Sequence, residues 1–108
     1  MAEMIYQSPK SIEEAVNLLA ASSGSVNILA GGTDLIIQMQ ANIDEPRVII
    51  DVKKIAEMTQ AELTEDALLL GPSMCCAALT AREDIKALFP GLVESAYLIG
   101  SSQVQGRA

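Results

Sequence analysis

Apolar residues recur at helical spacing directly after Ser11, and Glu14 lies where it completes a capping box with that serine. These apolar residues are Ile12, Ala15, Val16 and Leu19. The spacing predicts an amphipathic helix that ends near Ala21, where a serine- and glycine-rich stretch follows.

Two apolar runs of strand length come next, Val26 to Ala30 and the β-branched run from Arg47 to Val52. Between them, Gly31-Gly32-Thr33-Asp34 leads into apolar residues spaced for one or two helical turns, with Thr33 or Asp34 near the helix cap. The first half of the chain is therefore predicted to be βαβ-like.

The second half begins with two short candidate strands, Ala61 to Leu63 and Ala67 to Leu70, whose spacing is compatible with a hairpin. Three helical segments are then predicted: Cys75 to Ala81, Arg82 to Phe89 and Leu92 to Ile99. The fold class is α+β, with a division between two subdomains expected near residues 53–57.

Composition and charge exclude several functional classes. The 108 residues are 50% hydrophobic and carry a net charge of −7 with no basic stripe, so nucleic acid is not an expected partner. The absence of His rules out Ser-His-Asp triads and His-based zinc sites. The adjacent Cys75 and Cys76 suggest a buried, reduced pair in a cytoplasmic protein, and we expect no signal peptide, membrane span or metal site.

Chemistry is concentrated in the turn Gly31-Gly32-Thr33-Asp34. A strand that delivers two glycines and then a helix exposes consecutive backbone N–H groups, which together can bind a phosphate or pyrophosphate. The turn matches neither the Rossmann fingerprint nor the P-loop. From the pattern alone, a purely structural turn remains the alternative.

The segment LAGGTDLIIQM resembles the first flavin motif of the FAD-binding subunits in the molybdenum hydroxylase family, which includes xanthine dehydrogenase and carbon monoxide dehydrogenase. Further motifs occur in the family's order on both sides. Those resembling the entry helix are Tyr6, Pro9, Ser11, Glu14, Ala15 and Leu18-Leu19; those downstream are Pro46, Ile50-Asp51, Ile55, Gly71-Pro72, Pro90 to Leu92 and Leu98 to Gln103. The resemblance covers nearly the whole chain.

The resemblance implies the N-terminal part of a two-subdomain FAD-binding fold of the PCMH or vanillyl-alcohol oxidase type. Residues 1–54 would form the first small subdomain, and residues 55–108 the start of the second, incomplete at its C-terminus. The pyrophosphate of FAD would be wrapped by Leu29, Ala30, Gly31, Gly32, Thr33, Asp34, Leu35 and Ile36. Ile99 and Gly100 would lie near the isoalloxazine ring, and no catalytic residue is assigned.

The function implied by the resemblance is to hold the FAD that relays electrons from iron–sulfur clusters to NAD or another acceptor. The implied partners are a molybdopterin-binding large subunit and an iron–sulfur small subunit. We expect Gly32→Ala to weaken FAD binding by placing a Cβ where the pyrophosphate approaches.

Two departures from the family pattern leave alternatives open. Gln105 and Gly106 replace the family's Arg and Asn, and the chain ends at Ala108 before a second glycine-rich flavin motif. One alternative is a truncated fragment that binds no flavin and is only an interaction module or an inert remnant. Another is a stand-alone phosphate or nucleotide binder built on Gly31-Gly32.

Overall fold

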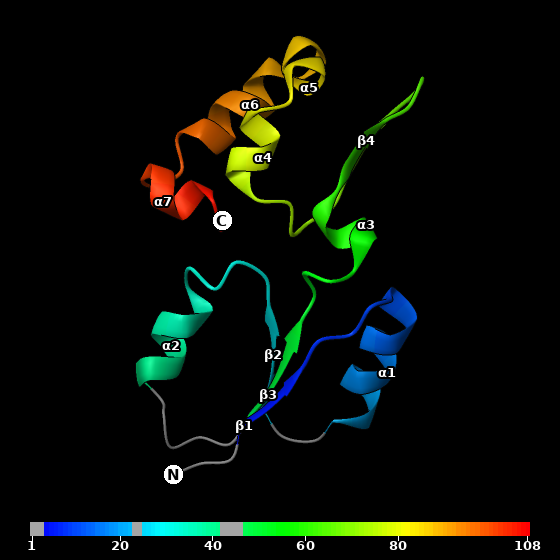
Figure 1. Cartoon of the computed structure of the whole chain (residues 1–108), viewed down its shortest axis with the longest axis vertical. Coiled ribbons are helices and arrows are strands. Elements are labelled where there is room, and N and C mark those ends of the chain that lie inside the picture. The colour runs from blue at the N-terminus through cyan, green and yellow to red at the C-terminus, as the bar shows by residue number, and fades with distance from the viewer. Residues whose placement is uncertain (1–3, 23–24, 42–46) are drawn as a thin grey trace. The chain divides into compact units, whose positions relative to one another are not determined.

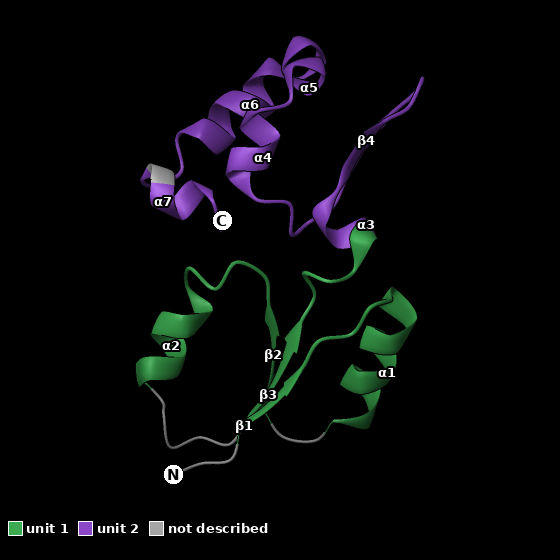
Figure 2. Ribbon diagram, in the orientation of Figure 1, with its two compact units in different colours: residues 1–56 green, residues 57–108 purple. Residues whose placement is uncertain are grey.

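A computed structural model describes residues 4–22, 25–41 and 47–108. The chain forms two compact units, Met1–Ala56 and Glu57–Ala108, which are coloured separately in Figure 2. The sequence places this division after Lys54. Each unit has its own secondary structure.

Unit 1 is built on a three-stranded parallel sheet with the order β1-β3-β2. The strands are β1 (Met4–Gln7), β2 (Ser25–Leu29) and β3 (Arg47–Asp51). Helix α1 (Ile12–Ala21) connects the first two strands and α2 (Leu35–Ala41) precedes the third, and the helices flank the strands in Figure 1. The predicted βαβ character of this half is confirmed, since β2 and β3 are parallel neighbours.

Strand β1 was not predicted, and it places Tyr6 in the sheet rather than in an entry helix. In the register of the sheet, Tyr6 and Asn27 both lie opposite Ile49 of the central strand. All four residues of β1 are exposed at the sheet edge. Such a short exposed strand has neither an apolar run nor a long alternation that would predict it from sequence.

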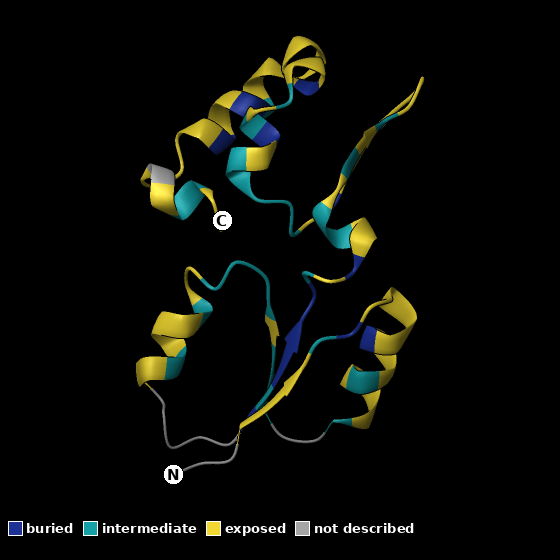
Figure 3. Cartoon of the chain, viewed as in Figure 1, coloured by how far each residue is buried: buried dark blue, intermediate teal, exposed yellow. Residues whose placement is uncertain are grey.

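The core of unit 1 follows its central strand, shown in dark blue in Figure 3. Ile49 and Ile50 are both buried although they point to opposite faces of the sheet. A central strand of a parallel sheet is covered on both faces and therefore has a nearly continuous apolar sequence. The β-branched run after Arg47 is such a sequence.

Helix α1 has the predicted N-cap, because the Ser11 hydroxyl accepts a hydrogen bond from the Glu14 N–H at 3.1 Å. The predicted amphipathic helix is confirmed, but most of the residues on its apolar face are not buried within the described residues. Ala15 alone is buried, whereas Ile12, Val16 and Leu19 are exposed. Spacing identifies which residues share a helix face, but only the part of α1 that packs against β3 is covered.

Helix α3 (Ala56–Thr59) starts at the last residue of unit 1, and unit 2 continues with the antiparallel hairpin of β4 (Ala61–Leu63) and β5 (Leu68–Leu70). The predicted hairpin is confirmed, and Thr64 closes its turn through a 2.8 Å hydrogen bond from its N–H to the Ala67 carbonyl. The short helix α3 was not predicted.

Four helices complete unit 2: α4 (Cys76–Thr80), α5 (Glu83–Leu88), α6 (Pro90–Tyr97) and α7 (Ser102–Gln105). Helix α6 begins at Pro90 rather than at Leu92, because proline suits the first position of a helix. Helix α7 was not predicted. The core of this unit consists of Leu79, Ile85, Val93 and Ala96.

The cysteine pair lies at the start of α4. Cys75 and Cys76 are unpaired thiols, and both are partly buried. The predicted thiol pair is therefore reduced, as expected, but the prediction that it is buried is wrong. The reason is local, because the N-terminal end of a short helix is only partly covered by its neighbours, whereas Leu79 in the same helix is fully buried.

Candidate functional site

The glycine turn lies at the C-terminal end of β2 and leads directly into α2. Gly32 adopts φ +81°, a left-handed conformation that residues with a side chain rarely adopt. The first backbone hydrogen bond on the helix side joins the Ile36 N–H to the Gly32 carbonyl at 3.3 Å. The left-handed residue lets the chain leave the strand and enter the helix with only the five residues 30–34 between them.

The backbone N–H groups of this turn have no partner among the residues that the structure describes. Within the described part of the chain, the backbone N–H groups of Gly31, Gly32, Thr33 and Asp34 donate to no other residue. Unpaired consecutive N–H groups around a left-handed glycine form a concavity that suits an anion. Gly31 and Gly32 are partly buried, while Thr33 and Asp34 are exposed. The turn therefore offers donors that a ligand can reach.

The space around Gly32 changes the interpretation of its substitution. A Cβ on Gly32 would lie 2.8 Å from Cδ1 of Ile36 and 3.3 Å from Cδ1 of Leu29. The added methyl would thus meet the turn's own side chains, in a backbone conformation that alanine disfavours. The sequence-based expectation was that Gly32→Ala acts by blocking the pyrophosphate. The structure adds a second cause, because the turn itself already requires glycine at this position.

The polar side chains of the turn point outward. Neither Thr33 nor Asp34 makes a capping hydrogen bond to the described N–H groups of α2. Instead, the Asp34 carboxylate accepts a hydrogen bond from the side-chain amide of Gln38, one helical turn later. The Thr33 hydroxyl remains available, and Asp34 is committed to its own helix.

The apolar members of the predicted site form the base and flank of the turn. Leu29, Ala30 and Leu35 are partly buried, and Ile36 is exposed. The Leu29 carbonyl accepts a 3.1 Å hydrogen bond from the Val52 N–H, which anchors the base of the turn to the segment after β3. All eight predicted pyrophosphate-binding residues, 29–36, are consecutive and belong to unit 1.

A polar network that the sequence did not predict lies beside this turn. Asp51, at the C-terminal end of β3, is only 6% exposed and accepts a hydrogen bond from the Tyr6 hydroxyl. Its other oxygen, Oδ1, lies 3.0 Å from Nζ of Lys53 and accepts the Lys53 N–H at 2.9 Å. The Lys53 ammonium also donates to the Ala30 carbonyl at 2.6 Å, at the base of the turn.

The network controls the ionisation of its buried carboxylate. Burial raises the pKa of Asp51, but the hydrogen bonds from Tyr6 and Lys53 favour the charged form and hold the pKa below its usual range. The same hydrogen bond to Asp51 raises the pKa of the Tyr6 hydroxyl. The sequence contained one indication of this network, because Asp51 is an acidic residue at the end of an otherwise largely apolar strand. Tyr6 could not be placed beside Asp51 without knowledge of strand β1.

Ile99 and Gly100 lie in unit 2, between α6 and α7. Gly100 adopts φ +52°, and a Cβ there would lie 3.1 Å from Cγ1 of Val104. Ile99 is 44% exposed. The structure thus gives Gly100 a backbone reason to be glycine and leaves the Ile99 side chain accessible.

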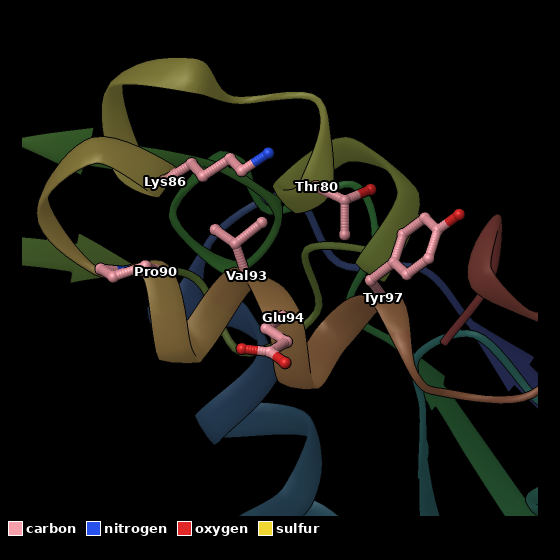
Figure 4. A pocket seen from close by; sticks show the side chains of 6 residues that line it. All are labelled: Thr80, Lys86, Pro90, Val93, Glu94 and Tyr97. Carbon is pink, nitrogen blue, oxygen red and sulfur yellow. The ribbon is translucent and has the colours of Figure 1, made fainter.

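A separate surface cavity of about 430 Å³ lies against α4, α5 and α6 (Figure 4). Its lining residues are Thr80, Lys86, Pro90, Val93, Glu94 and Tyr97. None of the ten predicted site residues belongs to it. The cavity follows from the packing of short helices and has no sequence signature of its own.

The described residues contain no group of three or more Cys, Asp or Glu side chains that could hold a metal ion. Among them, no helix is long and apolar enough to cross a membrane.

Comparison with known proteins identifies relatives over nearly the whole chain. Residues 2–108 match the family described as the FAD binding domain in molybdopterin dehydrogenase. The carbon monoxide dehydrogenase medium chain of Hydrogenophaga pseudoflava is 31% identical over 102 residues, covering 94% of this chain and 36% of the relative. The xanthine dehydrogenase FAD-binding subunit of Escherichia coli O157:H7 is 31% identical over 104 residues, covering 95% of this chain and 35% of that subunit.

The fold has the same relatives. A solved structure of Hydrogenophaga pseudoflava carbon monoxide dehydrogenase, lacking the Mo-pyranopterin moiety of its cofactor, aligns with a TM-score of 0.89 at 30% identity, covering 98% of this chain and 37% of that one. The chain thus spans about a third of the length of the relatives it matches. The predicted resemblance and the α+β fold are confirmed, and the chain belongs to the family of FAD-binding domains of molybdopterin dehydrogenases.

Proposed function

We propose that this chain is the FAD-binding portion of an oxidoreductase of the molybdenum hydroxylase type, and that its glycine turn holds the diphosphate of FAD. The observation that carries the proposal is that the backbone N–H groups from Gly31 to Asp34 have no partner among the described residues, in a member of an FAD-binding family. A diphosphate needs several donors on one side, and consecutive turn amides provide them.

The rest of the turn fits this role. Gly31 does not have a positive φ, so its backbone conformation does not require glycine. The absence of a side chain at Gly31 instead suits the close approach of a ligand to the backbone. The exposed Thr33 hydroxyl adds a donor next to the amides. Asp34, which is turned toward Gln38, does not occupy the amides of the turn. The backbone therefore carries most of the proposed recognition.

FAD supplies the electron transfer, and the chain's own residues bind and orient the cofactor. In unit 2, the exposed Ile99 with Gly100 is the proposed contact for the isoalloxazine ring. This contact rests on the family resemblance. Neither unit contributes a residue that we assign as a general acid or base.

The partners are proposed at the level of subunits. Two relatives are named as medium or FAD-binding subunits, which supports a large molybdopterin-binding subunit and a small iron–sulfur subunit as partners of this chain. NAD or another acceptor would receive the electrons, and a cytoplasmic location stays a prediction. The division into a first and a second FAD-binding subdomain, after residue 54, is proposed on the same basis.

The test is a titration of the 108-residue chain with FAD, followed by flavin fluorescence and visible absorbance. Gly31→Ala is the informative variant, because the φ of Gly31 is not positive and so does not itself exclude alanine, and we expect a Cβ at this position to obstruct the approach of a ligand to the amides. We expect saturable binding that Gly31→Ala weakens at an unchanged melting temperature. Gly91→Ala is the matched control, since a Cβ at Gly91 meets no atom within 4 Å.

Three outcomes would contradict the proposal. Equal FAD affinity of the wild type and Gly31→Ala would remove the turn from the site. Tight ADP binding that FAD does not improve would favour the nucleotide-binder alternative. Absence of any binding by this chain would favour the alternative of a fragment that binds no flavin.

A further inference from the structure

Lys53 is the only residue outside the glycine turn whose side chain is seen, among the described residues, to hold the turn's backbone. Its ammonium donates to the Ala30 carbonyl at 2.6 Å, immediately before Gly31. The lysine side chain is one-third exposed, so the contact lies at the protein surface beside the turn. A charge-assisted hydrogen bond of this length is among the stronger kinds in proteins.

Lys53 is itself held in place. The Asp51 side chain, 9% exposed, fixes the ammonium from one side through its Oδ1, 3.0 Å away. The Tyr6 hydroxyl binds the other oxygen of the same carboxylate. A lysine side chain normally loses much rotamer freedom on being fixed. Here the ion pair with the buried Asp51 carboxylate, which β1 and β3 orient, offsets that loss of entropy. It also directs the Lys53 ammonium to the Ala30 carbonyl.

The geometry of the peptide bond decides what this contact does. The Ala30 carbonyl and the Gly31 N–H belong to one planar trans peptide and point in opposite directions. A group that fixes the carbonyl therefore fixes the direction of the N–H. The ammonium lies on the carbonyl side, so it faces away from the direction in which Gly31 donates.

We propose that Lys53, oriented by Asp51 and Tyr6, is a positioning residue that aims the Gly31 N–H, and with it the glycine turn, at the diphosphate of the cofactor. This inference rests on the proposed function. Lys53 acts through the orientation of the turn rather than by contact with phosphate. The Val52 N–H, which binds the Leu29 carbonyl at 3.1 Å, fixes the preceding peptide in the same way, so two successive carbonyls of the turn's base are anchored.

The experiment compares Lys53→Met with Lys54→Met. Lys54 is exposed and makes no hydrogen bond or ion pair to the described residues, so the control removes the same charge one position away. FAD affinity, melting temperature and the amide signals of Gly31 and Gly32 in ¹⁵N-resolved NMR are measured for both variants. We expect Lys53→Met to bind FAD about tenfold more weakly and to shift the Gly31 amide signal, while Lys54→Met does neither.

A second variant covers the case in which Lys53→Met unfolds the unit. Lys53→Arg keeps a charged donor at the carbonyl and is expected to retain FAD affinity within about threefold of the wild type. Loss of affinity in Lys53→Arg without a fall in melting temperature would overturn the positioning role.

Other results also separate the possibilities. Equal FAD affinity of Lys53→Met and Lys54→Met would overturn the inference. Weaker binding with an unmoved Gly31 signal would assign Lys53 to direct phosphate contact instead. If the wild type has no affinity for FAD, the proposed function of this chain fails, and the Gly31 signal in Lys53→Met still decides whether Lys53 sets the orientation of the turn.

Discussion

Two turns of this chain pass from a strand through a glycine toward a helix, and they use the glycine differently. After β2, the N–H groups of residues 31–34 donate to no described residue. After β5, the Gly71 N–H donates to the Gln60 carbonyl at 2.8 Å, and the Ser73 N–H to the Met58 carbonyl at 2.6 Å. The first turn leaves donors for a ligand, whereas the second uses its donors to hold the protein together.

The reason for glycine also differs between the turns. Gly32 is required by its left-handed φ of +81°. Gly71 is buried, and a Cβ there would lie 2.6 Å from the Glu57 carbonyl oxygen, so it is required by packing against backbone. The family motifs contain both glycines, but only the surroundings distinguish a turn whose amides have no described partner from one whose amides bind within the protein.

Each unit also has a basic side chain that binds a backbone carbonyl beside a carboxylate. In unit 1, Lys53 holds the Ala30 carbonyl next to the buried Asp51. In unit 2, Arg82 donates to the Ala61 carbonyl at 3.0 Å and pairs with Asp84, whose side chain is 50% exposed. Solvent screens the second pair, so we expect it to matter much less.

The largest effect is expected for Gly71→Ala. Because the new Cβ would meet backbone atoms of Glu57 and Met58 that cannot rotate away, unit 2 should lose about 3 kcal/mol of unfolding free energy, measured by urea denaturation. Gly91→Ala, in open space within α6, should be neutral or slightly stabilising. A Gly71→Ala chain as stable as the Gly91→Ala chain would contradict the packing role.

Gly32→Ala should cost less, about 2 kcal/mol, through its left-handed backbone and the contact with Ile36. Adding Ile36→Ala should recover part of the loss by removing the atoms that the new Cβ meets. Denaturation of the single and double variants measures both components. If FAD affinity falls while stability stays unchanged, the methyl group blocks the ligand, and the original sequence-based expectation would be restored.

Tyr6→Phe should change how the free energy of unfolding depends on pH in the acid range. The pKa of Asp51 lies below its usual range in the folded chain, so its contribution is present above the unfolded-state pKa and is lost as pH falls through the folded-state value. Removing the Tyr6 hydroxyl raises that folded-state pKa. The acid-unfolding midpoint should therefore move to higher pH.

The measurement for Tyr6→Phe is denaturation between about pH 2 and pH 6. Tyr97→Phe is the control, because Tyr97 is 67% exposed and its hydroxyl binds no described residue. The same acid-unfolding midpoint in both variants would mean that the Tyr6 hydroxyl does not act on Asp51.

The smallest effect is expected for Asp84→Asn. The Arg82 guanidinium lowers the pKa of Asp84 to about 2, so the pair contributes above the usual aspartate pKa and loses its contribution as pH falls through about 2. Exposure keeps that contribution small. Melting curves of the variant and the wild type should differ slightly at neutral pH and converge near pH 2, and a large difference at neutral pH would refute the comparison between the two ion pairs.

Elements with a strong local signal were predictable. The capping box at Ser11, the β-branched run of β3 and the hairpin around Thr64 each have a pattern that few other structures share. Short elements were not predictable in this way. Strand β1 and helices α3 and α7 each have only four residues, too few for a hydrophobic period to emerge.

In the candidate site, too, the local features were predictable from the sequence and the long-range contacts were not. Its glycines could be read from the sequence, because a strand–Gly-Gly–helix order has a direct backbone meaning. The partners that hold the turn could not, because Tyr6 and Asp51 are 45 residues apart and meet only through the sheet. Likewise, helical spacing identified the apolar face of α1, but only packing decided that Val16 remains exposed.

The sequence by itself determined the family, the βαβ order of the first unit and the position of the glycine turn, since all three depend on local backbone preferences and ordered motifs. Only the three-dimensional structure showed that the amides of this turn have no partner among the described residues, that Gly32 is constrained by Ile36, and that Lys53 binds the Ala30 carbonyl. The Lys53 contact depends on the parallel register of β1, β3 and β2, which brings Tyr6, Asp51 and the glycine turn together. Local sequence encodes no such register.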